Sequence, residues 1–370
     1  MCRHFLIIFH MLICLSCVEI QSDSNDIREL QLPDIEEYVP SATTILFGGD
    51  YMQHLPQLTS AQNSDGSYDF LPTLRYMDSL WSSADLVALN FETTIGSGSY
   101  TGYPVFKSPV ECMSALKQSG VDLIFTANNH CCDGGRRGLA RTIDCADSLE
   151  LLHVGTYRDS MDYEKSRVLF VNSNGIEVAF MNYTYGTNGL PVPKGQVVGM
   201  IDTNAIKRDL ELAARADVKI VVMHWGWEYA RTENFNQRAL GRLCREWGAD
   251  FVVGAHPHVV QPADLYWSED SSLCGGVFYS LGNFISNQRE QYKDGGLCVK
   301  LYILKDIDGN LVFGVESVPV WVRKYIDNHK YRYEVLPAYL KGKVPMSAWD
   351  SIQFERSVKE NELHICDIFV

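Results

Sequence analysis

The sequence lacks several features that mark common classes of protein. Basic residues are scarce, since 32 lysines and arginines face 46 aspartates and glutamates, which gives a formal net charge of −14. An acidic surface repels phosphate backbones, so a nucleic-acid partner is not expected. No internal repeat and no low-complexity stretch appears after the N-terminal region. Repeat architectures are therefore excluded.

Paired cysteine motifs are also missing. Three of the eleven cysteines (Cys2, Cys14 and Cys17) stand near the N-terminus, and the other eight are scattered without repeated CxxC pairs. Structural zinc sites commonly use such thiolates, so their absence argues against one. Cys131 and Cys132 are adjacent and cannot bridge each other without strain. We expect most of the eight to be buried small hydrophobic residues.

A long apolar run is absent as well. The run from Phe5 to Cys17 is shorter than the ~20 residues that span a bilayer, and with Arg3 before it, it is typical of a secretory signal. We expect residues 1–20 to be a signal peptide or lipoprotein leader and residues 21–40 to be a polar tether. The protein is then exported to the cell envelope. Signal cleavage and lipid attachment at Cys17 both stay open.

What the sequence does contain is a recurring local pattern, in which a short apolar run ends in a cluster of polar residues. Near-continuous apolar runs of this length indicate strands buried on both faces. Stretches with helical spacing lie between several of them, and this alternation favours an α/β fold. The six apolar runs span residues 43–47, 85–89, 121–126, 218–223, 251–253 and 276–281, and the helical stretches span residues 138–152, 204–216 and 234–247.

Turn signals show that the sheets are mixed rather than purely parallel. Asn174-Gly175 lies between two apolar runs, which is a strong hairpin signal. Asp308-Gly309-Asn310 predicts a second hairpin. The region after Val318 carries no recognisable motif, but residues 348–361 read as a polar helix.

Potential metal ligands follow five of the apolar runs. Ligands of α/β sheets bind outside the carboxyl ends of the strands, so these side chains are expected to meet. Pro257 stiffens the backbone between two of the histidines, and extended geometry there would turn both imidazoles to one face. Mixed carboxylate, amide and imidazole ligands suit Mn²⁺, Fe²⁺ or Zn²⁺, as one or two ions. The predicted ligands are Asp50, Glu92, Asn129, His224, His256 and His258.

These positions belong to six ordered motifs that resemble the CapA family, which is named for bacterial poly-gamma-glutamate capsule biosynthesis. That family is assigned to the calcineurin-like metallophosphatase superfamily. The resemblance implies an α/β metallophosphatase-like layered α/β/β/α sandwich with mixed sheets over residues 41–322, with residues 323–370 as a C-terminal extension packed on it. The motifs are Gly49-Asp50, Asn90-Phe91-Glu92, Ala127-Asn128-Asn129-His130, His224-Trp225-Gly226, Gly254-Ala255-His256-Pro257-His258 and Tyr279-Ser280-Leu281-Gly282-Asn283-Phe284.

The resemblance also implies roles for these residues. His130 would contact the scissile phosphate and protonate the leaving group, and Asp133 would orient His130 or take part in acid–base work. For the metals, Asp50 and His258 would hold one ion, Asn129, His224 and His256 the other, and Glu92 would bridge the two.

One departure separates the chain from catalytic phosphoesterases, which usually carry Asp-x-His at the first strand. Tyr51 and Met52 follow Asp50 here, and His54 stands two positions too late. The first metal position therefore has one ligand fewer. This departure puts two-metal hydrolysis in doubt and leaves single-metal chemistry open.

Two functions follow from the resemblance. The first is an exported metal-dependent hydrolase or transferase that acts at a phosphoester, or a related bond, in the synthesis of capsule, poly-gamma-glutamate or another envelope polymer. Its partners would be an anionic envelope polymer or phosphoester substrate and a membrane-bound synthase complex. The second is a non-catalytic accessory protein that binds an anionic polymer or supports a membrane synthase. A surface lipoprotein with a decayed site is a third, weaker alternative.

Overall fold

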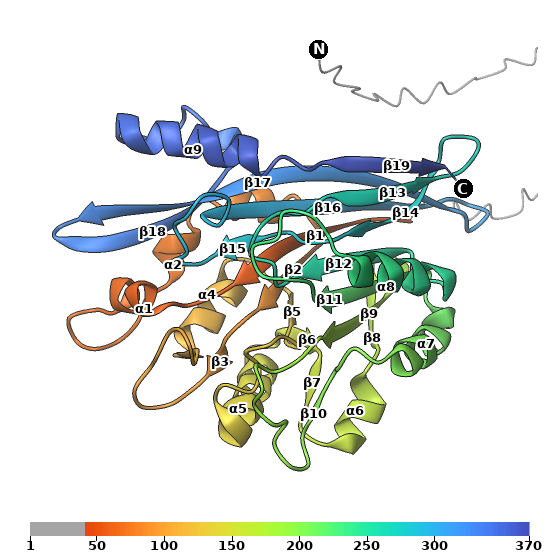
Figure 1. Cartoon of the computed structure of the whole chain (residues 1–370), viewed down its shortest axis with the longest axis horizontal. Helices are drawn as coiled ribbons and strands as arrows, with labels where there is room; N and C mark the ends of the chain where they lie inside the picture. The colour runs from red at the N-terminus through yellow and green to blue at the C-terminus, as the bar shows by residue number, and fades with distance from the viewer. Residues whose placement is uncertain (1–40, 370) are drawn as a thin grey trace, which may run out of the picture. The chain divides into compact units, whose positions relative to one another are not determined.

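The computed structural model describes residues 41–369, so the predicted leader (residues 1–20) and tether (residues 21–40) lie outside the described residues. Two large β-sheets dominate these residues, and helices lie along the outer faces of both (Figure 1). This arrangement confirms the predicted α/β/β/α layering with mixed sheets.

The first sheet has eight strands in the order β18-β17-β16-β1-β2-β5-β6, with β15 paired beside β1. β1, β2, β5 and β6 run parallel, whereas β16, β17 and β18 are antiparallel neighbours. The strands are β1 (Ser41–Tyr51), β2 (Leu86–Phe91), β5 (Leu123–Phe125), β6 (Leu152–Val154), β15 (Asn283–Ile285), β16 (Gly295–Lys305), β17 (Leu311–Asp327) and β18 (Lys330–Pro337).

The second sheet has seven strands in the order β19-β13-β14-β12-β11-β9-β8. Its centre, β9, β11, β12 and β14, is parallel. The strands are β8 (Leu169–Ser173), β9 (Ile176–Thr184), β11 (Val218–His224), β12 (Phe251–Ala255), β13 (Ala263–Trp267), β14 (Leu273–Phe278) and β19 (Ile365–Phe369). Two small pairs join β3 (Thr94–Ile95) to β4 (Lys107–Ser108) and β7 (Thr156–Tyr157) to β10 (Val197–Val198).

Nine α-helices accompany the sheets in the described part of the chain. Their ends follow from local chemistry; at the start of α8, for example, the Asn234 side chain accepts a hydrogen bond from the Gln237 backbone and the Gln237 side chain accepts one from the Asn234 backbone. The helices are α1 (Leu55–Ala61), α2 (Leu71–Leu74), α3 (Asp78–Trp81), α4 (Glu111–Gln118), α5 (Gly135–Ser148), α6 (Ser160–Ser166), α7 (Thr203–Leu212), α8 (Phe235–Glu246) and α9 (Ala348–Glu360).

The central core lies between the two sheets. Phe47 of β1, Phe125 of β5 and Phe180 of β9 contact one another, with ring centroids 6.2–6.4 Å apart. Successive residues of a strand point to opposite faces of its sheet. On the outer face of the first sheet, Leu46 of β1 packs against residues of α1 to α4. On the outer face of the second sheet, Val221 of β11 packs against residues of α7 and α8. Both sheets are therefore covered on each face, which explains why their strands read as unbroken apolar runs.

The predicted elements are present, with shifted ends. The run expected at residues 276–281 is strand β14 (Leu273–Phe278), and the helix expected at residues 138–152 is α5, after which Leu152 enters β6. Both predicted hairpins form, as β8–β9 and β16–β17. β17 crosses the boundary suggested at residues 322/323, and the residues after it add β18 to the first sheet and β19 to the second.

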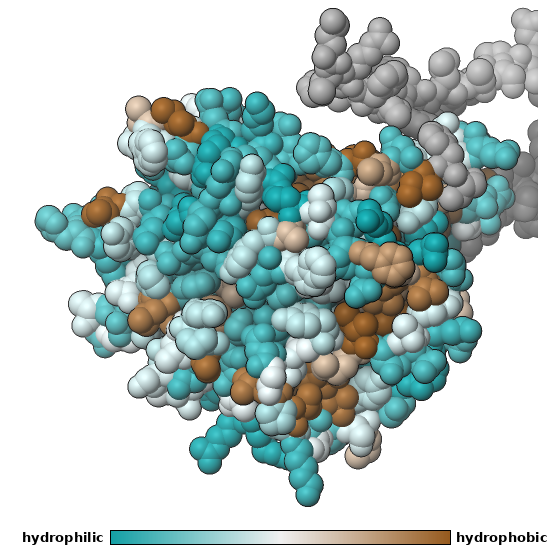
Figure 2. Space-filling model, in the orientation of Figure 1, coloured by the Kyte–Doolittle hydropathy of each residue, from teal (hydrophilic) through white to brown (hydrophobic). Residues whose placement is uncertain are grey.

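The surface is mainly hydrophilic on the face that Figure 2 shows, and the hydrophobic residues there gather in separate patches. The eight cysteines of the described residues are free thiols, and five of them are buried. Among residues 41–369, no helix has the length and apolar character needed to cross a membrane.

Candidate metal centre

The six predicted ligands converge where the two sheets end together. Asp50 lies in β1, Glu92 follows β2 and Asn129 follows β5, while His224 ends β11 and the remaining two histidines follow β12. Their side chains are buried in one polar neighbourhood, linked by the contacts described below. The exposed fractions are 0% for Asp50, Glu92 and His224, 1% for Asn129, 2% for His258 and 3% for His256.

Asp50 is fixed by an unusually close approach of two backbones. Its N–H donates to the Gly282 carbonyl at 2.9 Å. A Cβ at the preceding Gly49 would lie 1.9 Å from the same carbonyl oxygen, so only glycine fits there. Asp50 in turn lies 2.9 Å, through Oδ2, from Nδ1 of His258, and its Oδ1 accepts a 3.4 Å hydrogen bond from the His256 N–H. One carboxylate thus joins the first sheet to the histidine loop of the second.

Glu92 lies between two imidazoles. Its Oε1 is 3.7 Å from Nε2 of His224 and 3.8 Å from Nε2 of His258. His224 Nε2 also lies 2.9 Å from the Asn129 side-chain oxygen. The Glu92 carboxylate therefore occupies a central place between an Asp50–His258 side and an Asn129–His224 side, which is where a bridging carboxylate belongs.

The backbone of the histidine loop differs from the sequence-based expectation. The predicted extended geometry around Pro257 is wrong, because His256 and His258 have φ values of +98° and +58°. Such left-handed conformations cost a non-glycine residue about 1–3 kcal/mol and concentrate at functional sites. Both imidazoles still line one site, with ring centroids 5.9 Å apart. The turn, rather than strand alternation, brings them together.

The electrostatics of the cluster suit a cation. Burial, followed by the charges of Asp50 and Glu228, raises the pKa of Glu92 well above its usual value. Burial lowers the pKa of His224 well below 6.5 and that of His256 to about 3, so both are neutral at pH 7, as metal ligands must be.

Buried polar atoms that lack hydrogen-bond partners also indicate a cation site. Oε1 of Glu92 and Nδ1 of His256 make no hydrogen bond, although buried polar atoms normally do. Ligand atoms of Glu92, His224 and His256 lie within 4.8 Å of one another, as do those of Asp50, Glu92 and His258. The oxygen and imidazole donors present therefore fit a divalent metal ion.

His130 and Asp133 form a dyad beside the metal cluster. His130 Nδ1 lies 2.7 Å from Asp133 Oδ2, and the same oxygen accepts a 2.6 Å hydrogen bond from the Phe106 N–H. The carboxylate thereby fixes the ring so that Nε2 is the nitrogen left for chemistry. Both residues line a hollow of about 320 Å³ together with Tyr103, Pro104, Val105, Asn188, Leu190 and Glu228.

The histidine missing from the first metal position is not supplied by His54. That ring packs edge-on against Phe106, with centroids 5.0 Å apart, and accepts a 3.3 Å hydrogen bond from the Asn287 N–H. Tyr51 and Met52 are buried, and the Tyr51 hydroxyl donates to the Cys112 carbonyl at 3.1 Å, so neither supplies a metal ligand. The departure seen in the sequence therefore persists in the structure.

Several contributors were not singled out from sequence. Asn90 donates to Asp50 Oδ1 at 2.8 Å and to Glu92 Oε2 at 3.2 Å, and its place within the Asn90-Phe91-Glu92 motif was the available signal. Asn188 lies 3.2 Å from Asn129 and 3.4 Å from the His130 ring, but it belongs to a loop with no motif. Glu228, by contrast, follows the His224-Trp225-Gly226 motif, and the sequence suggests that it orients His224; in the structure its carboxylate lies beside His256 and His258.

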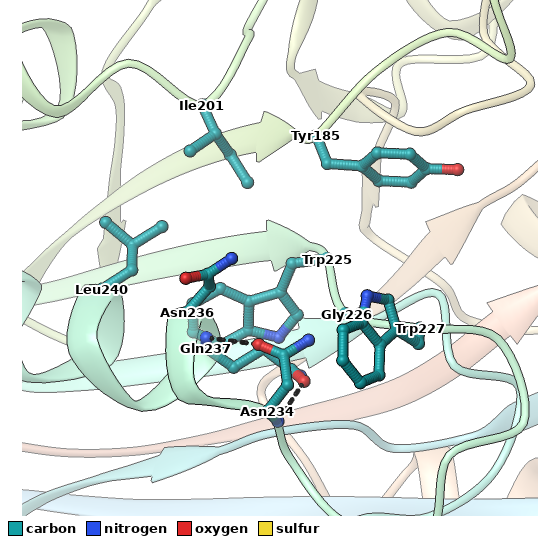
Figure 3. Close-up of a pocket in the computed structure, with 9 residues that line it drawn as sticks. All are labelled: Tyr185, Ile201, Trp225, Gly226, Trp227, Asn234, Asn236, Gln237 and Leu240. Atoms are coloured by element: carbon teal, nitrogen blue, oxygen red, sulfur yellow. Dashed lines mark hydrogen bonds between the residues drawn. The ribbon is translucent and has the colours of Figure 1, made fainter.

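Figure 3 shows the residues that line a second hollow, of about 480 Å³. Tyr185, one of them, connects it to the cluster, because its ring centroid lies 4.6 Å from that of His256. Trp227 stands at the edge of the hollow and is 70% exposed, whereas Trp225 is buried and donates to the Tyr279 carbonyl at 2.9 Å. The lining carries no formal charge. It consists of Tyr185, Ile201, Trp225, Gly226, Trp227, Asn234, Asn236, Gln237 and Leu240.

Comparisons with known proteins cover most of the chain. The family model of the bacterial capsule synthesis protein PGA_cap matches residues 44–288. Capsule biosynthesis protein CapA of Bacillus anthracis is 26% identical over 346 residues, which is 88% of this chain and 79% of that protein. PGA biosynthesis protein CapA of Bacillus subtilis (strain 168) is 26% identical over 271 residues, or 70% and 67% of the two chains. Among solved structures, the 5'-nucleotidase of Candida albicans SC5314 aligns with 74% of this chain and 51% of its own, at 13% identity and a TM-score of 0.43.

Proposed function

The chain belongs to the bacterial capsule synthesis protein PGA_cap family, and from this premise we propose that it is an exported envelope protein that uses a divalent metal centre in the synthesis of capsule polymer. Its chemistry would be hydrolysis or transfer at a phosphoester or a related bond. The supporting observation is the convergence of the carboxylates, the amide and the imidazoles on one buried cluster beside the His130–Asp133 dyad.

The ligands divide into two groups around Glu92. Asp50 and His258 would hold a cation on one side, and Asn129, His224 and His256 on the other, with Glu92 between them. Mn²⁺, Fe²⁺ and Zn²⁺ all suit this mixture of donors. A bound cation of this kind polarises a phosphoryl oxygen and lowers the pKa of a bound water.

The dyad supplies the proton chemistry. Asp133 accepts the hydrogen bond from His130 Nδ1 and its charge favours the doubly protonated imidazolium, from which Nε2 can donate its proton to a leaving oxygen in the adjoining hollow. Asn188 contacts the ring at 3.4 Å and helps to hold it.

A polymeric substrate would need contacts beyond the reacting bond. The neutral hollow beside Tyr185 and Trp227 (Figure 3) offers aromatic and amide surfaces next to the metal cluster, where the neighbouring repeat of a polymer chain could lie. A membrane-bound synthase as partner, and a lipid anchor at Cys17 or a cleaved signal, belong to this proposal.

The test is metal analysis of the purified protein combined with turnover of an aryl phosphate in Mn²⁺. We expect turnover to require metal and to fall at least 100-fold in His130→Ala, while His256→Ala loses the metal. His364→Ala, which removes an exposed histidine, serves as the control. Normal turnover in both His224→Ala and His256→Ala would refute a metal-dependent mechanism.

The accessory role has its own supporting observation, which is the absence of a histidine after Asp50. It predicts bound metal without turnover on any ester or amide. Hydrolysis that disappears in His130→Ala would exclude it.

A further inference from the structure

Glu228 stands on the loop that follows β11, beside the histidine loop. Two left-handed residues, Gly226 (φ +93°) and Tyr229 (φ +66°), turn this loop back toward the site. The Tyr229 N–H then donates to the Pro257 carbonyl at 2.8 Å. The loop is thereby tied to the same tripeptide that carries the two histidines, which keeps the backbone of Glu228 beside them.

The carboxylate faces the imidazoles directly. One oxygen of Glu228 and one ring nitrogen each of His256 and His258 all lie within 4.8 Å of one another. His256 is 3% exposed and its Nδ1 has no hydrogen-bond partner. In the described part of the chain no lysine or arginine forms an ion pair with Glu228. After burial, Glu228 is the largest cause that raises the pKa of the adjacent Tyr229, and its charge also helps to raise the pKa of Glu92 in the cluster.

The metal cluster lacks one ligand that the Glu228 carboxylate could supply. Asp50, Glu92 and His258 give only three ligands on the side where a first-strand histidine is missing, and Tyr51 and Met52 cannot replace it. Glu228 reaches the same imidazole, His258, from the second sheet. Glu228 is exposed, so the rim of the site on its side is open to solvent. A site that exchanges substrate needs such an opening.

We propose that Glu228 is a metal ligand on the His258 side of the cluster, where it fills the position left open by the missing first-strand histidine and helps to hold a borderline-hard divalent cation such as Mn²⁺ or Zn²⁺. The inference rests on the metal centre of the proposed function, but it is separate from the catalytic role of His130. It makes the His224–Tyr229 loop, rather than the first strand, the source of the missing ligand.

The experiment measures Mn²⁺ stoichiometry and affinity, by elemental analysis and by the electron paramagnetic resonance of free Mn²⁺, on the full chain without any substrate. We expect Glu228→Gln to lose one ion or to bind Mn²⁺ at least 10-fold more weakly, because an amide keeps the shape but not the charge. Glu228→Asp should recover part of the affinity. Glu290→Gln, which changes an exposed glutamate that also acts on Tyr229, is the control and should bind as the wild type does.

The outcomes separate the two proposals. If Glu228→Gln keeps the wild-type ion count and affinity while His256→Ala loses an ion, the metal centre stands and the role of Glu228 is refuted. If the wild type itself binds no ion, the proposed function fails together with this inference. Melting temperatures of the variants verify that each is folded.

Discussion

At the residue scale, Asn90 ties the metal cluster together although it is not among the predicted ligands. Its side chain donates to Asp50 and to Glu92 and lies 3.4 Å from Nδ1 of His224. Partners that orient metal ligands typically contribute 10–100-fold to metal affinity. We expect Asn90→Ala to weaken Mn²⁺ binding by about that factor, measured by calorimetry. Asn310→Ala, at an exposed hairpin turn, is the control, and equal affinities in the two variants would contradict this role.

A second residue-scale prediction concerns His54, whose pKa is lowered to about 4 by burial. The pKa of the folded state lies below the ordinary value of 6.5, so the contribution of the neutral ring to stability is complete above pH 6.5 and is lost as the pH falls toward 4. Between pH 7 and pH 5 the free energy of unfolding should fall by up to about 2 kcal/mol through this group.

His54→Gln should remove that part of the pH dependence, because a glutamine keeps a neutral acceptor but does not titrate. Urea denaturation at pH 5 and pH 7 measures the difference. The exposed imidazole of His364 gives the control variant His364→Gln, which should retain the wild-type pH dependence. If His54→Gln showed the same change in the free energy of unfolding between pH 5 and pH 7 as the wild type, the His54 ring would have the same pKa in the folded and unfolded states, and the prediction would be wrong.

At the element scale, the contact between the end of β1 and the turn before β15 positions Asp50. Because a methyl group at Gly49 would overlap the Gly282 carbonyl, Gly49→Ala must push these backbones apart. We expect a loss of at least 2 kcal/mol in the free energy of unfolding and weaker metal binding, measured by denaturation and calorimetry.

The control for this contact is Gly186→Ala, since a Cβ at Gly186 meets no atom within 4 Å and its φ is not in the left-handed range. That variant should change stability by less than 1 kcal/mol. If Gly49→Ala were equally mild, the close approach would not be what holds Asp50 in place.

At the scale of the whole described chain, the candidate metal centre joins two sheets that meet mainly through apolar packing. Asp50, Glu92 and Asn129 come from the first sheet, and the three histidines come from the second. A cation that binds only when the sheets are packed stabilises the folded state, by about 2.7 kcal/mol at a concentration 100 times its dissociation constant.

Mn²⁺ should therefore raise the melting temperature of the wild-type protein, and EDTA should reverse the change. Scanning calorimetry of wild type and His224→Ala, each with and without Mn²⁺, measures the effect. A similar rise in both proteins would mean that the ion binds elsewhere, for instance to the acidic surface.

The sequence by itself determined the elements and the membership of the cluster. Apolar runs with polar ends predicted the strands and the candidate ligands that meet in the cluster, because a strand buried on both faces must be apolar along its length and can carry polar groups only where it ends. The Asn-Gly pair and the Asp-Gly-Asn turn predicted the hairpins through their backbone preferences. Apolar runs, polar strand ends and turn pairs involve residues close together in the sequence, so a single sequence is enough to recognise them.

The tertiary structure alone decided how the strands divide between two sheets and how the ligands meet. The left-handed turns at His256 and His258, the place of Glu92 between two imidazoles, and the reach of Glu228 across the histidine loop depend on contacts between residues far apart in sequence. No spacing or periodicity encodes these contacts, because they arise from the packing of one sheet on the other. The elements are therefore local properties of the chain, and the geometry of the site is a property of the fold.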